Sequence, residues 1–458
     1  MGLVSASHRK IVDADVFARS LQRWIPDPFA IALALTLLAF GLAWTVGDAT
    51  APELIDGWIS GPRGMWSLLS FAMQMCLILV TGFAVANTGP VQSLLAWVAT
   101  QAKTPGQAAA LVSVVSMVLA LFNWGLGLIA GALLAREVGR AMHAQGKPVH
   151  YPLLAAAGYT GMCVWHCGLS GSAPLKVSQM GNLQEVLGPA LAQSVGALEL
   201  SRTVFSVPNI AVTLTLLVVV PTALWAMAPS SPDRCVPPPR EAPAPHPAPA
   251  RQGLAGALES GPWLIIPIVV GMGGWTARWL ASDGLATLDP NSMNLVFLMI
   301  GLMFAGSPAA YMAHAHRAAS ATAGIIVQFP FYAGILGILA AGGLVPRLAH
   351  LLPTGEALPM ATFISAGALN LFVPSGGGQW SLQGPVVMSA AIEGGTDPGR
   401  VVMALAWGDQ WTNLVQPFWA LPLLGITGTR ASDILGYTSL LAVLVGIVGA
   451  IGCLIPTL

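Results

Sequence analysis

Charge is scarce in this sequence. Only 8% of its 458 residues are Asp, Glu, Lys or Arg, against roughly a quarter in an ordinary soluble domain. The hydrophobic fraction is 55%, the mean hydropathy is +0.72 and the formal net charge is zero. Zero net charge gives no reason to expect nucleic acid as a partner. The composition instead predicts an all-α polytopic membrane protein whose first partner is the lipid bilayer.

Disulfide and metal frameworks are also lacking. Four of the five cysteines lie in apolar stretches and the fifth stands in a linker, which is unlike a secreted disulfide scaffold; they are Cys76, Cys163, Cys167, Cys453 and Cys235. His166 lies between Cys163 and Cys167, but the spacing supplies no fourth ligand for zinc. We therefore predict no metal site and no cofactor, and His166 remains a candidate to face a cavity.

Apolar runs of about 20 residues are the unit for counting membrane spans. They predict spans at 29–47, 66–88, 151–178, 203–227, 261–280, 291–308, 320–345, 400–425 and 434–456. The segments 105–135 and 359–392 each contain a polar or glycine-rich break near the middle. We interpret both as re-entrant hairpins, although two thin full spans would give the same sidedness.

The distribution of positive charge predicts a cytoplasmic N-terminus. With that orientation, thirteen of the nineteen Lys and Arg residues fall on the cytoplasmic side, as the positive-inside rule requires. The predicted organisation is a cytoplasmic segment at 1–28, a first membrane repeat at 29–227, a linker at 228–260, and a linking span with the second repeat at 261–458. Nine prolines within 229–252 indicate an extended cytoplasmic tether, and a passive linker is its simplest interpretation.

The two halves show a weak internal similarity. Residues 73–89 align with 327–343 at an offset of 254, and Pro105 and Pro359 share that offset, as do Asn123 and Gly377. The unpaired span at 261–280 inverts the second half relative to the first. Inverted-topology repeats are typical of transporters, because two similar halves can exchange roles in opening each side.

Both halves are interrupted at matching places. Each hairpin and each following span contains a break rich in Gly, Ser, Asn or Pro: Asn123, Trp124, Gly125 and Gly127; Gly168, Ser170, Gly171, Ser172 and Pro174; Pro374, Ser375, Gly376, Gly377, Gly378 and Gln379; Thr412, Asn413, Gln416 and Pro417. Half-helix N-termini present unpaired N–H groups that suit a carboxylate, and unwound carbonyls suit a cation. The alternative is that these small residues only permit tight helix packing.

Two charged residues accompany the breaks. Asp409 is the only acidic residue deep within a predicted span, and an intramembrane acid is a functional candidate by default. We assign it to ion coupling, as a proton carrier or a sodium ligand; the alternative is an interfacial acid satisfied by Gln410 or Asn413. Lys176 follows the first broken span and either attracts an anion or extends to the interface.

Several motifs carry a family resemblance. The segments RWIPDPF from Arg23, FNWGLGL from Phe122, VQFPFYAGI from Val327, PSGGGQWSLQGP from Pro374 and WGDQWTNLVQPFWALPLLG from Trp407 resemble the short-chain fatty acid transporter family of the AtoE type. That family is similar to the larger ion-transporter superfamily. The resemblance implies uptake of acetoacetate or butyrate across a bacterial inner membrane, and by analogy a homodimer with a scaffold domain and a mobile, elevator-like transport domain. His166, Cys167 and Lys176 depart from the family pattern.

Together, these features predict secondary active transport of a short-chain monocarboxylate, coupled to H⁺ or Na⁺. The polar breaks would bind the carboxylate, and Trp124, Trp380 and Trp419 would surround the acyl tail. ATP is not the expected energy source, because Gly146 and Lys147 are followed by Pro148 rather than completing a phosphate-binding loop. A passive anion channel is the alternative. An enzyme is disfavoured, since neither Ser170 nor Ser375 has a nearby His and acid in a nucleophile-elbow context.

Overall fold

The computed structural model describes residues 28–61, 64–229, 231–239, 253–282, 290–344 and 352–456. Every regular element within these ranges is helical. The predicted N-terminal segment up to residue 27 and residues 240–252 of the predicted linker lie outside the described residues.

The long apolar runs form helices close to the predicted spans. They are α2 (Pro28–Val46), α4 (Leu69–Ala86), α12 (Val207–Met227), α14 (Ile265–Ser282), α15 (Pro290–Ala305), α17 (Ala323–Ala341) and α23 (Ala431–Leu454). Within the described residues, six helices or joined helices are long and apolar enough to cross a membrane. Leu37 on α2 is 75% exposed, as expected of a side chain that faces lipid rather than water. The chain is therefore a multi-pass membrane protein.

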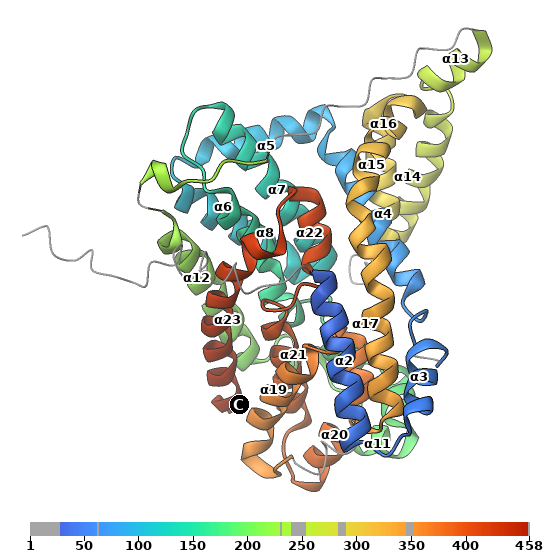
Figure 1. Ribbon diagram of the computed structural model, residues 1–458, viewed down its shortest axis with the longest axis vertical. Helices are drawn as coiled ribbons and strands as arrows, with labels where there is room; N and C mark the ends of the chain where they lie inside the picture. The colour runs from blue at the N-terminus through green and yellow to red at the C-terminus, as the bar shows by residue number, and fades with distance from the viewer. Residues whose placement is uncertain are drawn as a thin grey trace, which may run out of the picture.

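One group of helices forms the right-hand side of the molecule in Figure 1. There α4 packs against α15 and against the short α16 (Pro308–Ala319), and α14 packs against α15. The helix α2 buries Ala32, Ala39 and Ala43 and packs against α17. Small residues at such spacing let two membrane helices approach closely.

The segment predicted as the first hairpin forms two helices, α6 (Pro105–Phe122) and α7 (Trp124–Ala144), joined at Asn123. A Cβ atom on Gly127 would overlap that of Ala120, and one on Gly131 would lie 2.5 Å from Oγ of Ser116. These pairs move in opposite directions along the chain, so the two helices are antiparallel. Asn123 caps α7 by accepting a hydrogen bond from the Leu126 N–H.

The segment predicted as the second hairpin forms two helices, α19 (Leu358–Asn370) and α20 (Gly376–Glu393). Gln379 Nε2 donates to the Ala366 carbonyl at 2.9 Å, and Gln383 Nε2 donates to Ser365 Oγ at 2.9 Å, which shows an antiparallel pair. Ser375 caps α20 by accepting from the Gly378 N–H. In Figure 1 this hairpin lies at the lower end of the molecule, and α6 and α7 lie in its upper part.

The helix after each hairpin is broken. The predicted span 151–178 contains α8 (Tyr151–Tyr159), the 3-10 helices η1 (Thr160–Cys163) and η2 (Trp165–Cys167), and α9 (Ser172–Lys176). The predicted span 400–425 consists of α21 (Pro398–Thr412) and α22 (Ala420–Thr427). In each half the first hairpin arm runs parallel to the broken helix: Ser113 bonds Thr160 and Leu121 bonds Leu169, whereas Gly367 bonds Thr412 and Asn370 bonds Asn413.

Two details differ from the sequence-based expectation. The glycines 376–378 do not interrupt a helix but form the first turn of α20, and Gly125 and Gly127 likewise lie inside α7. The breaks themselves are only Asn123 and residues 371–375, because a capping side chain starts a new helix immediately. The short helices α5 (Gly89–Gln101), α10 (Met180–Leu187), α11 (Pro189–Val195) and α16 are not predicted, since counting apolar runs ignores short or polar helices.

The described start of the linker, residues 231–239, is attached to the helices. The Tyr151 N–H donates to the Val236 carbonyl at 2.8 Å, and the Val236 N–H donates to Nδ1 of His150 at 3.2 Å. Because Nδ1 accepts, Nε2 carries the hydrogen in the neutral ring and donates to the Tyr437 hydroxyl at 2.7 Å. The linker thus contacts the start of α8, and His150 connects this contact to α23.

Candidate functional site

The tip of the second hairpin lies against the first broken helix. A Cβ atom on Gly376 would lie 2.5 Å from Nε2 of His166 and 2.7 Å from Cη2 of Trp165. Glycine therefore allows the start of α20 to contact the imidazole directly. The Trp165 and His166 rings are stacked, with centroids 3.6 Å apart. The predicted break at Gly376 thus meets, at one buried point, a segment that lies about 200 residues earlier and directly before the predicted break at Gly168.

The other side of His166 faces α21. Its Nδ1 lies 3.1 Å from the Ala406 carbonyl oxygen and 3.6 Å from Oδ1 of Asp409. Its backbone N–H donates to Oε1 of Gln410 at 3.1 Å. Both His166 and Asp409 are fully buried, and neither Asp409 oxygen has a hydrogen-bond partner among the described residues. Burying an ionised carboxylate without a hydrogen-bond donor costs free energy, so a negative charge on Asp409 is unfavourable here unless a positive charge lies beside it.

The tip of the first hairpin lies against the same broken helix from another direction. The Trp124 N–H donates to Ser170 Oγ at 2.8 Å. The ring of Trp124 also contacts Trp419, in the second broken helix, with centroids 4.9 Å apart in an edge-to-face arrangement. Trp165 lies 6.4 Å from both rings. The three indoles therefore form one aromatic cluster at the junction of three breaks.

Phe418 extends this cluster toward α17. Its ring stacks on Phe329 at 4.4 Å and meets Tyr332 edge-to-face at 4.9 Å. These rings are buried and extend the aromatic cluster from Trp419 to α17.

The break between α21 and α22 is held by polar contacts. Asn413 Oδ1 accepts from Asn370 Nδ2 at 2.8 Å and from Gln416 Nε2 at 3.1 Å. The Asn413 carbonyl accepts from the Tyr159 hydroxyl at 2.9 Å, which joins the break to α8. Gln416 Oε1 in turn accepts from the Phe418 N–H. These bonds satisfy backbone and side-chain groups that lipid would leave unpaired.

The predicted site residues occupy two neighbouring zones, one around His166 and the Gly376 tip and the other around Trp124 and Trp419. Trp165 contacts both zones, the Gly376 tip on one side and Trp124 and Trp419 on the other. Gly171 approaches the His166 carbonyl so closely that its Cβ would lie 2.6 Å away, Ser172 is the first residue of α9, and Nζ of Lys176 lies 3.9 Å from a Cβ on Gly377. Pro374 and Pro417 lie in the breaks themselves. Gln379 is fully buried and bonds α19, and Trp380 belongs to a separate buried cluster with Ala173 and Val402.

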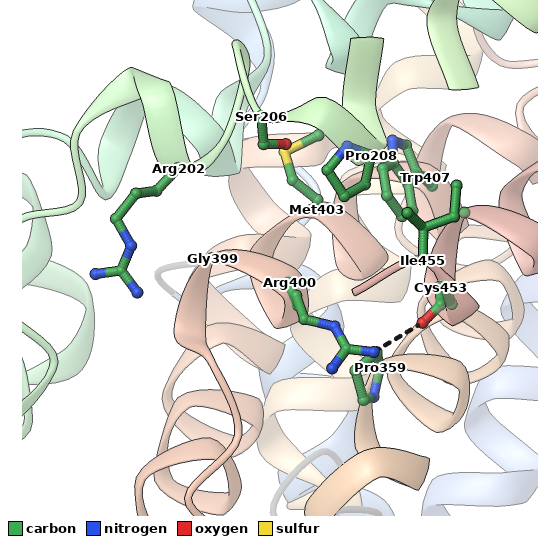
Figure 2. A pocket seen from close by; sticks show the side chains of 11 residues that line it. Arg202, Ser206, Pro208, Pro359, Gly399, Arg400, Met403, Trp407, Cys453 and Ile455 are labelled. Carbon is green, nitrogen blue, oxygen red and sulfur yellow. Dashed lines mark hydrogen bonds between the residues drawn. The ribbon is translucent and has the colours of Figure 1, made fainter. Parts of the chain in front are cut away.

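A surface pocket lies beside this site at the ends of α12, α21 and α23 (Figure 2). Arg400 there donates from Nη2 to the Cys453 carbonyl at 3.2 Å. Trp407 forms one wall and donates its indole N–H to Oδ1 of Asn209 at 3.1 Å. Asn209 donates from Nδ2 to the Cys167 carbonyl at 2.9 Å, so the pocket wall is linked by hydrogen bonds to the residue next to His166.

Sequence reasoning missed part of this arrangement. Trp165, Gln410 and the Ala406 carbonyl surround His166, but neither a backbone carbonyl nor a tryptophan in an apolar run gives a local signal. His166 itself was visible as a histidine inside an apolar stretch. Among the described residues no three His, Cys, Asp or Glu side chains gather as metal ligands would.

The all-helical fold and its buried, broken helices define the class: a multi-pass membrane transport protein. Comparisons with known proteins narrow this class. The profile described as Short chain fatty acid transporter matches residues 11–455. The chain belongs to the short-chain fatty acid transporter family, and no catalytic family is indicated.

Two curated relatives cover nearly the whole chain. A protein of Escherichia coli K12, whose name assigns it to the short-chain fatty acid transporters, is 39% identical over 447 residues, which are 95% of this chain and 97% of the relative. A protein of Haemophilus influenzae Rd with the same name is 37% identical over 424 residues, 91% and 93% of the two chains. The family resemblance in the sequence motifs is thereby confirmed.

Two solved structures are distantly similar. The YdaH transporter of Alcanivorax borkumensis has a TM-score of 0.42 and 18% identity, covering 93% of this chain and 97% of the other. MtrF of Neisseria gonorrhoeae has a TM-score of 0.37 and 13% identity, covering 96% of each chain. Both TM-scores are too low to transfer topology or mechanism to this chain.

Proposed function

We propose that the protein is an ion-coupled symporter of short-chain monocarboxylates, such as acetoacetate and butyrate, in a bacterial cytoplasmic membrane. One observation carries the proposal: the tips of two antiparallel hairpins lie against the same broken helix, one on Trp165 and His166 and the other on Ser170. Such a junction supplies helix N-termini for a carboxylate and an aromatic wall for a short tail.

The substrate carboxylate would bind at the start of α20, where Ser375 caps the helix and Gly376 has no side chain to keep a ligand away from the helix N-terminus. Asn123, Ser170, Ser172, Asn413 and Gln416 supply further polar groups. The Trp124, Trp165 and Trp419 cluster would surround the acyl tail, and its compact size favours a short chain. Asp409 would couple transport to an ion, because its buried carboxylate needs a counter-charge.

The proposed mechanism is alternating access by an elevator-like movement of the hairpins and broken helices against the α2, α4 and α14–α17 group, in a homodimer. The parallel packing of each first hairpin arm on its broken helix supports a repeated unit. The unpaired span at 261–280 would invert the second copy, and the excess of Lys and Arg on one side supports a cytoplasmic N-terminus. The two hairpins would then be re-entrant and enter from opposite sides.

Uptake into proteoliposomes tests this function. Purified protein is reconstituted, loaded with unlabelled acetoacetate and assayed for counterflow of labelled acetoacetate, with protein-free liposomes to correct for diffusion of the neutral acid. We expect saturable counterflow and accumulation against the acetoacetate gradient when an ion gradient is imposed. Saturable exchange without any uphill accumulation would favour the passive channel, and no protein-dependent flux of acetoacetate or butyrate would refute the function.

A further inference from the structure

The hydrogen bonds of His166 fix where its proton lies. Nδ1 faces the Ala406 carbonyl oxygen at 3.1 Å, and a carbonyl can only accept. Nδ1 therefore carries the hydrogen in the neutral ring, and Nε2 carries a lone pair. No described residue forms a hydrogen bond with Nε2, although the side chain is fully buried. The ring thus has one nitrogen anchored and one free to bind a proton.

That free nitrogen faces the hairpin tip. Nε2 lies 2.5 Å from the position that a Cβ on Gly376 would take, at the first turn of α20. A neutral imidazole presents only a lone pair there, which repels a carboxylate. A protonated imidazole presents an N–H at the same point and attracts one. Binding of a carboxylate at this tip is therefore favoured by a proton on His166.

Asp409 supplies the matching counter-charge. Its Oδ1 lies 3.6 Å from Nδ1 of His166, and its two oxygens have no donor among the described residues. Of the elements packed around the pair, α6, α12 and α19 contain no charged residue, and α20 contains only Glu393 at its far end. Lys176 on α9 approaches the tip at Gly377, and the Cys167 thiol contacts Gln410. An imidazolium between Asp409 and a bound carboxylate would be stabilised from both sides.

Resting on the proposed function, we propose that His166 is the proton-binding group of a carboxylate–proton symport and that Asp409 balances its charge. A proton from the water on the open side adds to the Nε2 lone pair, and the resulting N–H donates to the substrate carboxylate at the α20 tip. On the other side the carboxylate and that proton leave together. Sodium is disfavoured, because the N–H donor Nδ1 of His166 lies 3.6 Å from Oδ1 of Asp409, whereas hard cations require oxygen ligands.

Proton uptake on binding tests the inference. Isothermal titration of acetoacetate into detergent-purified protein, in sodium-free buffers of different ionisation enthalpy at one pH, gives the number of protons bound with each ligand. We expect about one proton per acetoacetate in the wild type and about none in His166→Asn. The matched control is His143→Asn, an exposed histidine at the end of α7, which should leave the proton number unchanged.

The outcomes separate the two proposals. Counterflow of acetoacetate that requires sodium and binds no proton would overturn the inference and leave the transport function standing. Proton uptake that persists in His166→Asn would also overturn it, by assigning the proton to another group. Absence of any acetoacetate binding and flux in the wild type would refute the function itself. If His166→Asn does not fold, His166→Gln is the second variant, and a wild-type proton number of zero would by itself overturn the inference.

Discussion

Gly376→Ala tests the contact between the second hairpin and His166. The added Cβ would lie 2.5 Å from Nε2 of His166 and 2.7 Å from Cη2 of Trp165, whereas ordinary contact begins at 3.4 Å. The two opposing rings are stacked and buried, so the hairpin tip must retreat by roughly 1 Å. Overpacking of this kind costs about 1–3 kcal/mol.

That cost should appear in ligand binding. If the closed position of the hairpin tip is destabilised by about 1–3 kcal/mol, the apparent affinity for the ligand falls by roughly 5- to 150-fold. The assay is the concentration dependence of acetoacetate counterflow in proteoliposomes, together with the melting temperature of the purified protein. We expect a large increase in the half-saturating concentration and a modest change in melting temperature.

Gly377→Ala is the matched control for this variant. It lies in the same first turn of α20, but its Cβ would meet only Nζ of Lys176, at 3.9 Å. Both substitutions raise the helix propensity by the same amount, so the two variants differ only in the space between the new methyl group and the His166 ring. Equal half-saturating concentrations for the two variants would refute the idea that the Gly376 contact with His166 shapes the site.

The remaining predictions concern other contacts. Asp409→Asn should abolish gradient-driven accumulation while the protein stays folded, and unchanged coupled transport would remove Asp409 from the mechanism. Ser170→Ala should destabilise the first hairpin by about 1–3 kcal/mol, seen as a lower melting temperature, because the Trp124 N–H loses its acceptor. His150→Ala should speed tryptic cleavage after Arg234, because Val236 loses its bond to Nδ1, whereas Tyr437→Phe keeps that bond and should not. Hydrogen bonds from the backbone N–H and hydroxyl of Thr50 hold the pKa of Glu53 below its usual range. The ionised Glu53 therefore stabilises α3 (Ala51–Ile59) above the usual glutamate pKa, and this stabilisation is lost as the pH falls through the lowered pKa. The difference in melting temperature between the wild type and Glu53→Gln should therefore vanish in acid.

Local chemistry explains which parts of the fold are visible in the sequence. Thr104 with Pro105, Asn123 and Ser375 each mark a helix start, since a capping side chain or an N-terminal proline acts within one turn. The positions of both hairpins are therefore predictable to within a few residues. The 3-10 geometry of Thr160 to Cys167 is not predictable, because the run is largely apolar and Gly161 alone does not distinguish a 3-10 turn from an α-helix. There the cause is tertiary, because Gly161 and Gly168 lie directly against Ser116 and Leu121 of α6.

The helix α16 shows the opposite failure. Its sequence PAAYMAHAHRAA contains two histidines and an arginine, so a search for apolar runs treats it as a loop. Yet Ser307 caps it, Pro308 starts it, and Arg317 lies 5.6 Å above the Phe83 ring of α4. Capping signals would have found this helix, and hydropathy alone did not.

The partners of the candidate site are the least predictable part, and the reason also bears on function. Each break can be recognised from its own residues, but nothing in 374–378 specifies that Gly376 will lie on His166 rather than on another ring. That pairing depends on how α19 and α21 pack together, through close contacts such as Gly408 on Phe363. Because α21 also carries Ala406 and Asp409, the same packing positions both the anchor of the imidazole and its counter-charge. Any movement of α20 away from α21 would expose Nε2 while Nδ1 stays bound to Ala406. A single hairpin displacement would therefore open the carboxylate site and the proton site together, as coupling of the two requires.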